Sequence, residues 1–176
     1  PDIPLLSLLD VFLHDSCVCL VSLIYHCNLC AFVDNPQLSI ELTKYIFTQI
    51  LIGMNYLHKI IKYCHCDLKP ANILVDDGAK VIKICDFGLS CPIATFYERR
   101  DNNLVTLWYR PPELFVNYIK ALDPTKIDGW SLGCILAELV GGRALFPGIN
   151  EYHQLRIILN MAGLCEVQTH IDEKTE

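Results

Sequence analysis

The sequence predicts an α+β domain in which helices dominate and short strands form small hairpins. Two observations predict the helices: apolar residues recur at helical spacing after Ser39, and residues 127–140 are apolar on nearly every side. A third predicts the strands, since short apolar runs near residues 5–25 and 73–84 are interrupted by turn residues. The chain has 176 residues, enough for one domain with a substantial core.

The first element is a predicted hairpin. Residues 5–12 and 17–25 are apolar, and residues 14–16 (His-Asp-Ser) separate them as a turn. Cys17 and Cys19 lie among Leu and Val residues, where thiols behave as small hydrophobes, so we expect the second strand to be buried.

The helices follow. Ser39 is a typical N-cap for a long amphipathic helix that continues to Leu57. Residues 73–84 form two short strands around an Asp-Asp-Gly turn at 76–78. Residues 127–140 predict a buried helix at the centre of the domain, and another helix starts at Leu155 and continues to Met161.

Composition excludes several classes of partner. The net charge is −6 and no basic run is present, which argues against nucleic acid and anionic membrane as partners. The longest apolar stretch, residues 18–25, is too short to span a bilayer. No secretory signal is visible, so we expect the ten cysteines to be reduced, as in the cytosol.

A zinc site is one alternative for the N-terminal cysteines. Cys17 and Cys19 form a C-x-C pair, and Cys27 and Cys30 form a C-x-x-C pair. Structural zinc sites usually show two well-formed ligand pairs, and this reading explains nothing downstream, so a strand with packed thiols is preferred.

Two motifs carry the chemistry. Residues 65–72 read His-Cys-Asp-Leu-Lys-Pro-Ala-Asn, and Asp-Phe-Gly follows at 86–88, 19 residues after Asp67. They resemble the catalytic loop and the metal-binding turn of a protein kinase. In phosphoryl transfer, Asp67 would orient the attacking hydroxyl and accept its proton, and Lys69 would offset charge on the transferring phosphate. Asn72 and Asp86 would supply the oxygen ligands that Mg²⁺ prefers.

Three further motifs follow in order: Trp-Tyr-Arg-Pro-Pro-Glu at 108–113, Asp-Gly-Trp-Ser-Leu-Gly at 128–133, and Gly-Arg-Ala-Leu-Phe-Pro-Gly at 142–148. Together they resemble the CMGC group of Ser/Thr kinases, which includes cyclin-dependent and mitogen-activated kinases. Thr106 and Leu107 favour the cyclin-dependent side, and residues 152–159 favour the mitogen-activated side.

The resemblance implies a protein-kinase-like fold: residues 1–27 as a two-strand remnant of the N-lobe with the hinge, and residues 28–176 as a mostly helical C-lobe, incomplete at its C-terminal end. It implies ATP and Mg as cofactors, a protein substrate and a regulatory subunit as partners, and a cytoplasmic or nuclear location. The family prefers Ser or Thr followed by Pro, a preference associated with the segment around Arg110. Asp128 is expected to hold the backbone of the catalytic loop, and His65 to pack against Phe87.

The resemblance also assigns the nucleotide-binding residues. Ser22 takes the place of the gatekeeper at the back of the adenine pocket. Residues 20–28 are the hinge, in which Leu23 and Tyr25 offer backbone groups to adenine and Asn28 replaces an Asp that contacts the ribose. Leu74 would lie under the adenine ring. The presence of both Lys69 and Thr106 is the pattern of Ser/Thr kinases rather than Tyr kinases. The resemblance therefore implies that Thr106 is a catalytic residue together with Asp67 and Lys69.

The sequence departs from the family at the phosphorylation switch. Cys66 replaces the Arg that pairs with a phosphothreonine, and Asp101 and Asn103 stand where the phosphorylated hydroxyls would be. One hypothesis is activity that does not depend on phosphorylation at this site. The equally weighted alternative is relaxed selection on an inactive copy.

The sequence starts at Pro1 without a Met, so we expect its true beginning to lie upstream. The Gly-rich phosphate loop, the strand Lys and the helix Glu that clamp the phosphates in kinases are absent from this sequence. Without them, exposed apolar surface, reduced stability and weak or absent activity are expected. The competing function is a catalytically silent kinase-like module that binds a protein partner. Histidines other than His65 are expected to be on the surface or incidental.

Overall fold

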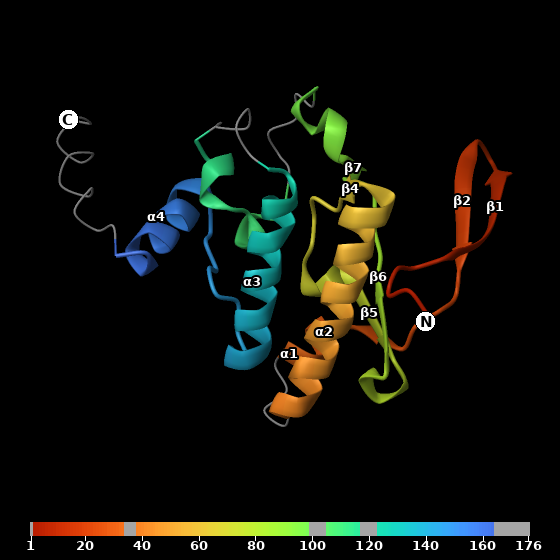
Figure 1. Ribbon diagram of the computed structural model, residues 1–176, viewed down its shortest axis with the longest axis horizontal. Coiled ribbons are helices and arrows are strands. Elements are labelled where there is room, and N and C mark those ends of the chain that lie inside the picture. Colours follow the sequence, from red (N-terminus) through yellow and green to blue (C-terminus); the bar gives the residue numbers. More distant parts are fainter. Residues whose placement is uncertain (1, 34–37, 99–104, 117–122, 164–176) are drawn as a thin grey trace.

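A computed structural model describes residues 2–33, 38–98, 105–116 and 123–163 (Figure 1). The strands are β1 (Leu8–His14), β2 (Cys17–Ser22), β3 (Cys27–Asn28), β4 (Tyr63–Cys64), β5 (Ile73–Asp76), β6 (Val81–Ile84) and β7 (Cys91–Pro92). The helices are α1 (Cys30–Val33), α2 (Ile40–Tyr56), α3 (Thr125–Gly141) and α4 (Glu151–Met161). The predicted mixture of helices with short strands is confirmed.

Helices α2 and α3 lie side by side and carry much of the core (Figure 1). The N-cap of α2 is Ser39, as predicted: its hydroxyl oxygen accepts a hydrogen bond from the backbone N–H of Leu42 at 3.1 Å. One face of α2 buries Ile46, Ile50 and Met54, which recur every four residues. The predicted amphipathic helix is therefore confirmed.

Helix α3 is less buried than its sequence suggests. Ile127 and Ile135 are fully buried, but Val140 is 74% exposed and Leu136 is 37% exposed. Together with α2, these two residues line a shallow apolar groove. The expectation of burial on nearly every side was wrong for Leu136 and Val140, because no element in the described part of the chain covers them.

A three-stranded antiparallel sheet, in the order β3-β5-β6, supports the catalytic residues. The β5–β6 turn is the predicted one, with Gly78 in the left-handed region at φ 60°. The segment before β1 extends this sheet: Ile84 N–H donates to the Pro4 carbonyl at 3.0 Å, and Leu6 N–H donates to the Ile84 carbonyl at 2.8 Å. This pairing attaches the N-terminal end of the chain to the helical body.

Strands β1 and β2 form the predicted hairpin, which projects away from the helices (Figure 1). Its strands pack mainly on each other. The second strand ends at Ser22 rather than at 25, and Cys17 is exposed and Cys19 only half-buried, so the expectation of a buried strand was wrong. The apolar pattern alone does not say whether a second layer covers the strand. The predicted exposed apolar surface is confirmed here by residues including Leu13 (76%) and Leu20 (64%).

Helix α4 begins four residues earlier than predicted. Asn150 is its N-cap and accepts a hydrogen bond from the His153 backbone N–H at 2.8 Å, so the helix starts at Glu151 rather than Leu155. In the part of the chain that the structure describes, no helix combines the length and the apolar character needed to cross a membrane.

Candidate active site

Asp128, in the first turn of α3, holds the catalytic loop by its backbone. Its carboxylate accepts hydrogen bonds from the backbone N–H groups of His65 and Cys66, both at 2.9 Å. The residue is fully buried, and the N-terminal end of a helix favours a negative charge. The predicted anchoring role of Asp128 is confirmed.

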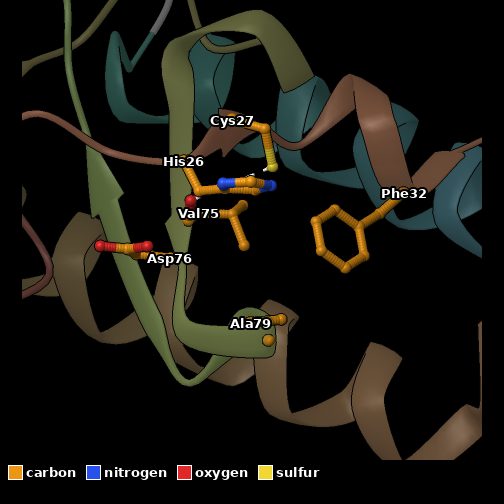
Figure 2. Close-up of a pocket in the computed structure, with 7 residues that line it drawn as sticks. His26, Cys27, Phe32, Val75, Asp76 and Ala79 are labelled. Carbon is orange, nitrogen blue, oxygen red and sulfur yellow. Dashed lines mark hydrogen bonds between the residues drawn. The ribbon is translucent and has the colours of Figure 1, made fainter.

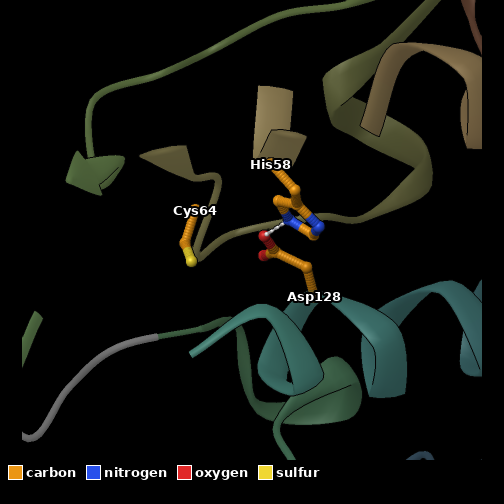
Figure 3. Close-up of side chains that lie close together, drawn as sticks. All are labelled: His58, Cys64 and Asp128. Carbon is orange, nitrogen blue, oxygen red and sulfur yellow. Dashed lines mark hydrogen bonds and ion pairs between the residues drawn. The ribbon is translucent and has the colours of Figure 1, made fainter. Parts of the chain in front are cut away.

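The same carboxylate accepts a third hydrogen bond from His58 Nε2 at 2.7 Å (Figure 3). His58 lies in the π-helical turn Leu57–Ile61 that continues α2, and only 13% of its side chain is exposed. The expectation that this histidine is on the surface or incidental was wrong. An Asp within an apolar helix predicts that its carboxylate is buried and hydrogen-bonded. The sequence does not predict which residue bonds to it, because His58 comes close to Asp128 only through the packing of α2 on α3.

The structure brings the predicted catalytic residues together around Asp67. Lys69 Nζ donates to Asp67 Oδ2 at 2.7 Å, and the Thr106 hydroxyl donates to Asp67 Oδ1 at 2.7 Å. Lys69 also donates to the Thr106 hydroxyl oxygen at 2.9 Å, which closes a triangle of side chains. Asn72 Nδ2 donates to the Asp67 carbonyl at 2.9 Å and approaches Oδ2 at 3.3 Å.

This arrangement keeps Asp67 ionised. Burial by itself would raise the pKa of the Asp67 carboxyl, but hydrogen bonds from Lys69 and Thr106 and the charge of Lys69 together outweigh it. The net result is a pKa below the usual Asp value. Near neutral pH the group is therefore a carboxylate that can accept a hydrogen bond from an incoming hydroxyl.

The Asp86 turn is bonded to the catalytic loop through the backbone of its neighbour. Cys85 N–H donates to the Asn72 carbonyl at 2.9 Å, and His65 Nε2 donates to the Cys85 carbonyl at 3.0 Å. The His65 ring packs on Phe87 with centroids 5.3 Å apart, as predicted. Asp86 itself is exposed and left-handed at φ 61°, which turns the chain sharply after β6.

The two predicted metal ligands have the chemistry for Mg²⁺. The Asn72 amide nitrogen donates its hydrogen bonds to Asp67. The amide oxygen lies on the opposite side of the planar group and therefore points away from Asp67. Asp86 offers an exposed carboxylate, held by a weak hydrogen bond from Gly88 N–H at 3.3 Å. One neutral and one charged oxygen donor are a set that Mg²⁺ accepts together with water and phosphate oxygens.

The predicted nucleotide residues divide into two groups. Asn28 and Leu74 are direct partners across β3 and β5, so the end of the hinge lies beside the expected floor of the adenine site. The Asn28 side chain accepts a hydrogen bond from the Cys30 backbone N–H at 3.1 Å at the start of α1. Ser22 and Tyr25 are half-buried and Leu23 is 60% exposed, in or just after β2. Their roles in binding nucleotide remain predictions.

A pocket of about 440 Å³ lies beside β5 near the hinge (Figure 2). Val75 and Phe32 face each other across it, and His26 and Cys27 line its upper side. Leu74, whose side chain points to the opposite face of β5 from Val75, is not among the residues that line this pocket.

Arg110 shapes the backbone just before Thr106. Its Nε and Nη2 groups donate to the Val105 carbonyl at 3.1 and 3.0 Å, and its Nη1 pairs with Glu151 at 2.6 Å. Val105 is left-handed, with φ 69°, an uncommon conformation for a β-branched residue. The bonds from Arg110 hold the Val105 carbonyl inward.

The predicted loss of the phosphorylation switch is only partly visible. Asp101 and Asn103 lie outside the described residues. Cys66 is buried, with its sulfur 3.9 Å from the Cys91 sulfur. A thiol therefore occupies the position where the family pattern has an Arg.

The model of the protein kinase domain family matches residues 4–176. The chain belongs to the protein kinase family. This kinase chain is 41% identical over 133 residues to mitogen-activated protein kinase 14 of Arabidopsis thaliana, covering 74% of the chain and 34% of that protein. It is 42% identical over 127 residues to cyclin-dependent kinase C-3 of Oryza sativa subsp. japonica, covering 68% of the chain and 36% of that protein.

Among solved structures, this kinase chain is similar to the yeast RNA Pol II CTD kinase CTDK-1 complex, with a TM-score of 0.77 and 33% identity over 90% of the chain and 52% of the matched chain. The predicted protein-kinase-like fold and the resemblance to the CMGC group are confirmed. The kinase chain spans about a third of the length of the curated relatives given above.

Proposed function

We propose that the protein carrying this chain transfers the γ-phosphoryl group of ATP, with Mg²⁺, to Ser or Thr residues of protein substrates. The observation that supports this most is the Asp67, Lys69 and Thr106 triangle, which joins an ionised carboxylate to a cation at hydrogen-bond distance. Asp67 orients the substrate hydroxyl and takes its proton. Lys69 offsets the negative charge that moves with the phosphoryl group.

Asn72 and Asp86 would hold Mg²⁺, which when bound neutralises charge on the phosphates. The hydrogen bond between Cys85 and Asn72 keeps the two ligand-bearing segments together. Ser22, Leu23, Tyr25, Asn28 and Leu74 are proposed to bind the adenosine part of ATP. We propose a cytoplasmic or nuclear location and a regulatory subunit, the latter because a similar solved structure is a kinase complex.

A preference for Pro after the phosphorylated residue is part of the proposal. The Val105 carbonyl is already bonded to Arg110, so it is not available to a backbone N–H of the substrate. A residue with an N–H would leave that donor unpaired, whereas Pro has no N–H to satisfy. Substrates with Ser-Pro or Thr-Pro are therefore favoured.

Phosphate transfer to a Ser-Pro peptide tests this function, measured with the chain alone and with a chimera in which it replaces the matching segment of a mitogen-activated relative. We expect weak transfer by the chain alone and clear transfer by the chimera, with a lower rate on the matched Ser-Ala peptide. Asp67→Asn and Asp86→Ala should abolish transfer, and Asp10→Asn, an exposed control, should not. A chimera that folds but does not transfer phosphate would favour the silent protein-binding module.

A further inference from the structure

Two buried thiols from segments far apart in the sequence meet at the start of the catalytic loop. The Cys66 sulfur lies 3.9 Å from the Cys91 sulfur, although the two residues are 25 positions apart in the chain. Cys66 is 1% exposed and Cys91 is 7% exposed. Neither thiol has a part in the proposed phosphoryl transfer.

The backbone next to each cysteine holds the two thiols in place. Strands β4 and β7 pair antiparallel, with Cys64 opposite Cys91. The Ser90 hydroxyl donates a hydrogen bond to the His65 carbonyl at 3.1 Å. Ser90 and His65 directly precede the two cysteines, so this bond joins the same two segments a second time. The closeness of the sulfurs therefore follows from main chain that is bonded on both sides.

We propose that Cys66 and Cys91 are a redox-active pair that forms an intramolecular disulfide when the protein is oxidised. The sulfurs of a disulfide lie about 2.05 Å apart, so the two sulfurs must approach each other by about 2 Å. A rotation of each side chain that moves its sulfur by about 1 Å closes this gap. Strands β4 and β7 can therefore stay paired while the bond forms.

Hydrogen peroxide is a sufficient oxidant for this bond. It oxidises the thiol of Cys91, the more exposed of the two residues, to a sulfenic acid and releases one water. The Cys66 sulfur then attacks the Cys91 sulfur, the S–O bond breaks, and the Cys66 proton leaves with the hydroxyl group as a second water. In sum, two thiols and one peroxide give one disulfide and two waters, and two electrons pass from sulfur to the peroxide.

Both thiols are protected, so the bond should form slowly. The neighbouring Cys64 and burial raise the pKa of the Cys66 thiol above its ordinary value. The attacking form is the thiolate, which makes the second step slow near neutral pH. Burial also limits the access of peroxide to Cys91. The pair should therefore respond to sustained oxidation, over hours rather than seconds, and a thiol reductant should reverse it.

The disulfide would join two segments of the proposed active site. Cys66 directly precedes Asp67, and Cys91 follows Asp86 by five residues. The bond would fix the catalytic loop to β7 covalently, in addition to the hydrogen bond from Ser90. Only this consequence rests on the proposed function, because the bond itself depends on the two thiols and an oxidant. A cross-link also constrains the unfolded chain, so the oxidised chain should be more stable.

Mass spectrometry of the whole chain tests the pair, after peroxide treatment and alkylation of the remaining thiols. Cleavage after Lys and Arg should release residues 63–80 linked to residues 84–99, and fragmentation should join Cys66 to Cys91. Dithiothreitol should separate the two peptides. Cys66→Ala and Cys91→Ala should each abolish the link. Cys64→Ala and Cys85→Ala are matched controls within the same two peptides, and both should keep it.

Three results would overturn the pair: no link in the oxidised chain, a link that fragmentation assigns to Cys64 and Cys91, or a link that survives in Cys66→Ala. Fragmentation of the linked peptides from the unaltered chain names the two sulfurs directly. The assignment therefore stands or falls even where a variant does not fold.

Thermal unfolding gives a second measurement on chains with matching circular dichroism spectra. Dithiothreitol added after oxidation should lower the unfolding temperature of the unaltered chain and of Cys64→Ala by about 5 °C or more. The same treatment should leave Cys66→Ala unchanged, because it has no bond to reduce. An equal fall in Cys66→Ala would contradict the assignment, since other thiols would then carry the effect.

Discussion

The catalytic loop and the N-terminal hairpin are both built from short extended segments, yet they are stabilised in opposite ways. The catalytic loop has little regular structure, but its backbone and side chains are bonded to Asp128 and Asn72, which lie within the core. The β1–β2 hairpin has regular pairing, but its apolar side chains are largely exposed. We therefore expect the buried hydrogen bonds of the catalytic loop, rather than the regular pairing of the hairpin, to mark the more stable region.

The two regions also carry different parts of the proposed function. The residues proposed for phosphoryl transfer lie in the bonded region, where Asp67 has four hydrogen-bond donors around its oxygens and carbonyl. Residues proposed for the adenine side, such as Ser22 and Leu23, lie at the end of the exposed hairpin. We therefore expect substitutions in the two regions to have very different effects on the free energy of unfolding.

Removal of Asp128 should have the largest effect. Asp128→Ala leaves the backbone N–H groups of His65 and Cys66 and the ring of His58 without their acceptor in a buried site. We expect the free energy of unfolding to fall by roughly 3–5 kcal/mol, measured by urea denaturation. The exposed control Asp10→Ala should stay within about 0.5 kcal/mol. Similar losses in both variants would show that the catalytic loop is not specially stabilised.

Gly53→Ala tests the attachment of the hairpin to the body. A Cβ at Gly53 would lie 2.9 Å from both the Pro4 carbonyl oxygen and Ile84 Cδ1, so the N-terminal segment must shift. We expect a loss of about 1–3 kcal/mol in urea denaturation. Gly133→Ala, in α3 with no atom within 4 Å, should instead gain up to about 1 kcal/mol. A neutral Gly53→Ala would mean that the segment before β1 is not packed against α2.

Lys69→Met tests the electrostatics of the bonded region. The lowered pKa of Asp67 means that its stabilising contribution is present above the pKa of an unfolded Asp and is lost as the pH falls through the folded value. Loss of Lys69 should raise the pKa of the Asp67 carboxyl, which can be measured by NMR of the carboxyl carbon as a function of pH. The stability difference between the two proteins should be greatest near neutral pH and shrink in acid below the usual Asp pKa. An unchanged Asp67 pKa would contradict the ion pair.

The smallest effect on stability is expected in the hairpin. Leu13 and Val18 are cross-strand partners and are 76% and 64% exposed. Replacement by the opposite charges in Leu13→Lys with Val18→Glu should change the free energy of unfolding by less than about 0.5 kcal/mol. The same double variant should self-associate less, measured by light scattering, because it removes exposed apolar surface. A large loss of stability would reveal an unseen contact of the hairpin.

Much of this architecture could be predicted from local patterns. The four-residue spacing of Ile46, Ile50 and Met54 predicts the buried face of α2, and Ser39 predicts where the helix begins. Motif spacing predicts the closeness of Asp67, Lys69 and Asn72, because these residues are near in sequence and share one loop. Thr106 joins them from 39 residues away, and its place was predictable only through resemblance to the kinase family.

The predictions that were wrong, on burial and on His58, share a physical cause. The apolar character of Cys17, Leu136 and Val140 predicts burial, but burial depends on which surface packs against each residue, and hydropathy carries no such information. His58 looks incidental in the sequence, since no motif includes it. Its buried bond to Asp128 exists because α2 and α3 cross where the catalytic loop begins.

The sequence by itself determined the kinase family, the order of the elements and the identity of the acids proposed for catalysis, because these depend on residue type and spacing along the chain. Tertiary structure alone decided the contacts that no motif indicates: His58 with Asp128, and Cys66 with Cys91. Each of these pairs is separated by at least 25 residues, and such contacts arise only when helices and loops pack. Periodicity describes one element at a time, whereas packing brings distant elements together.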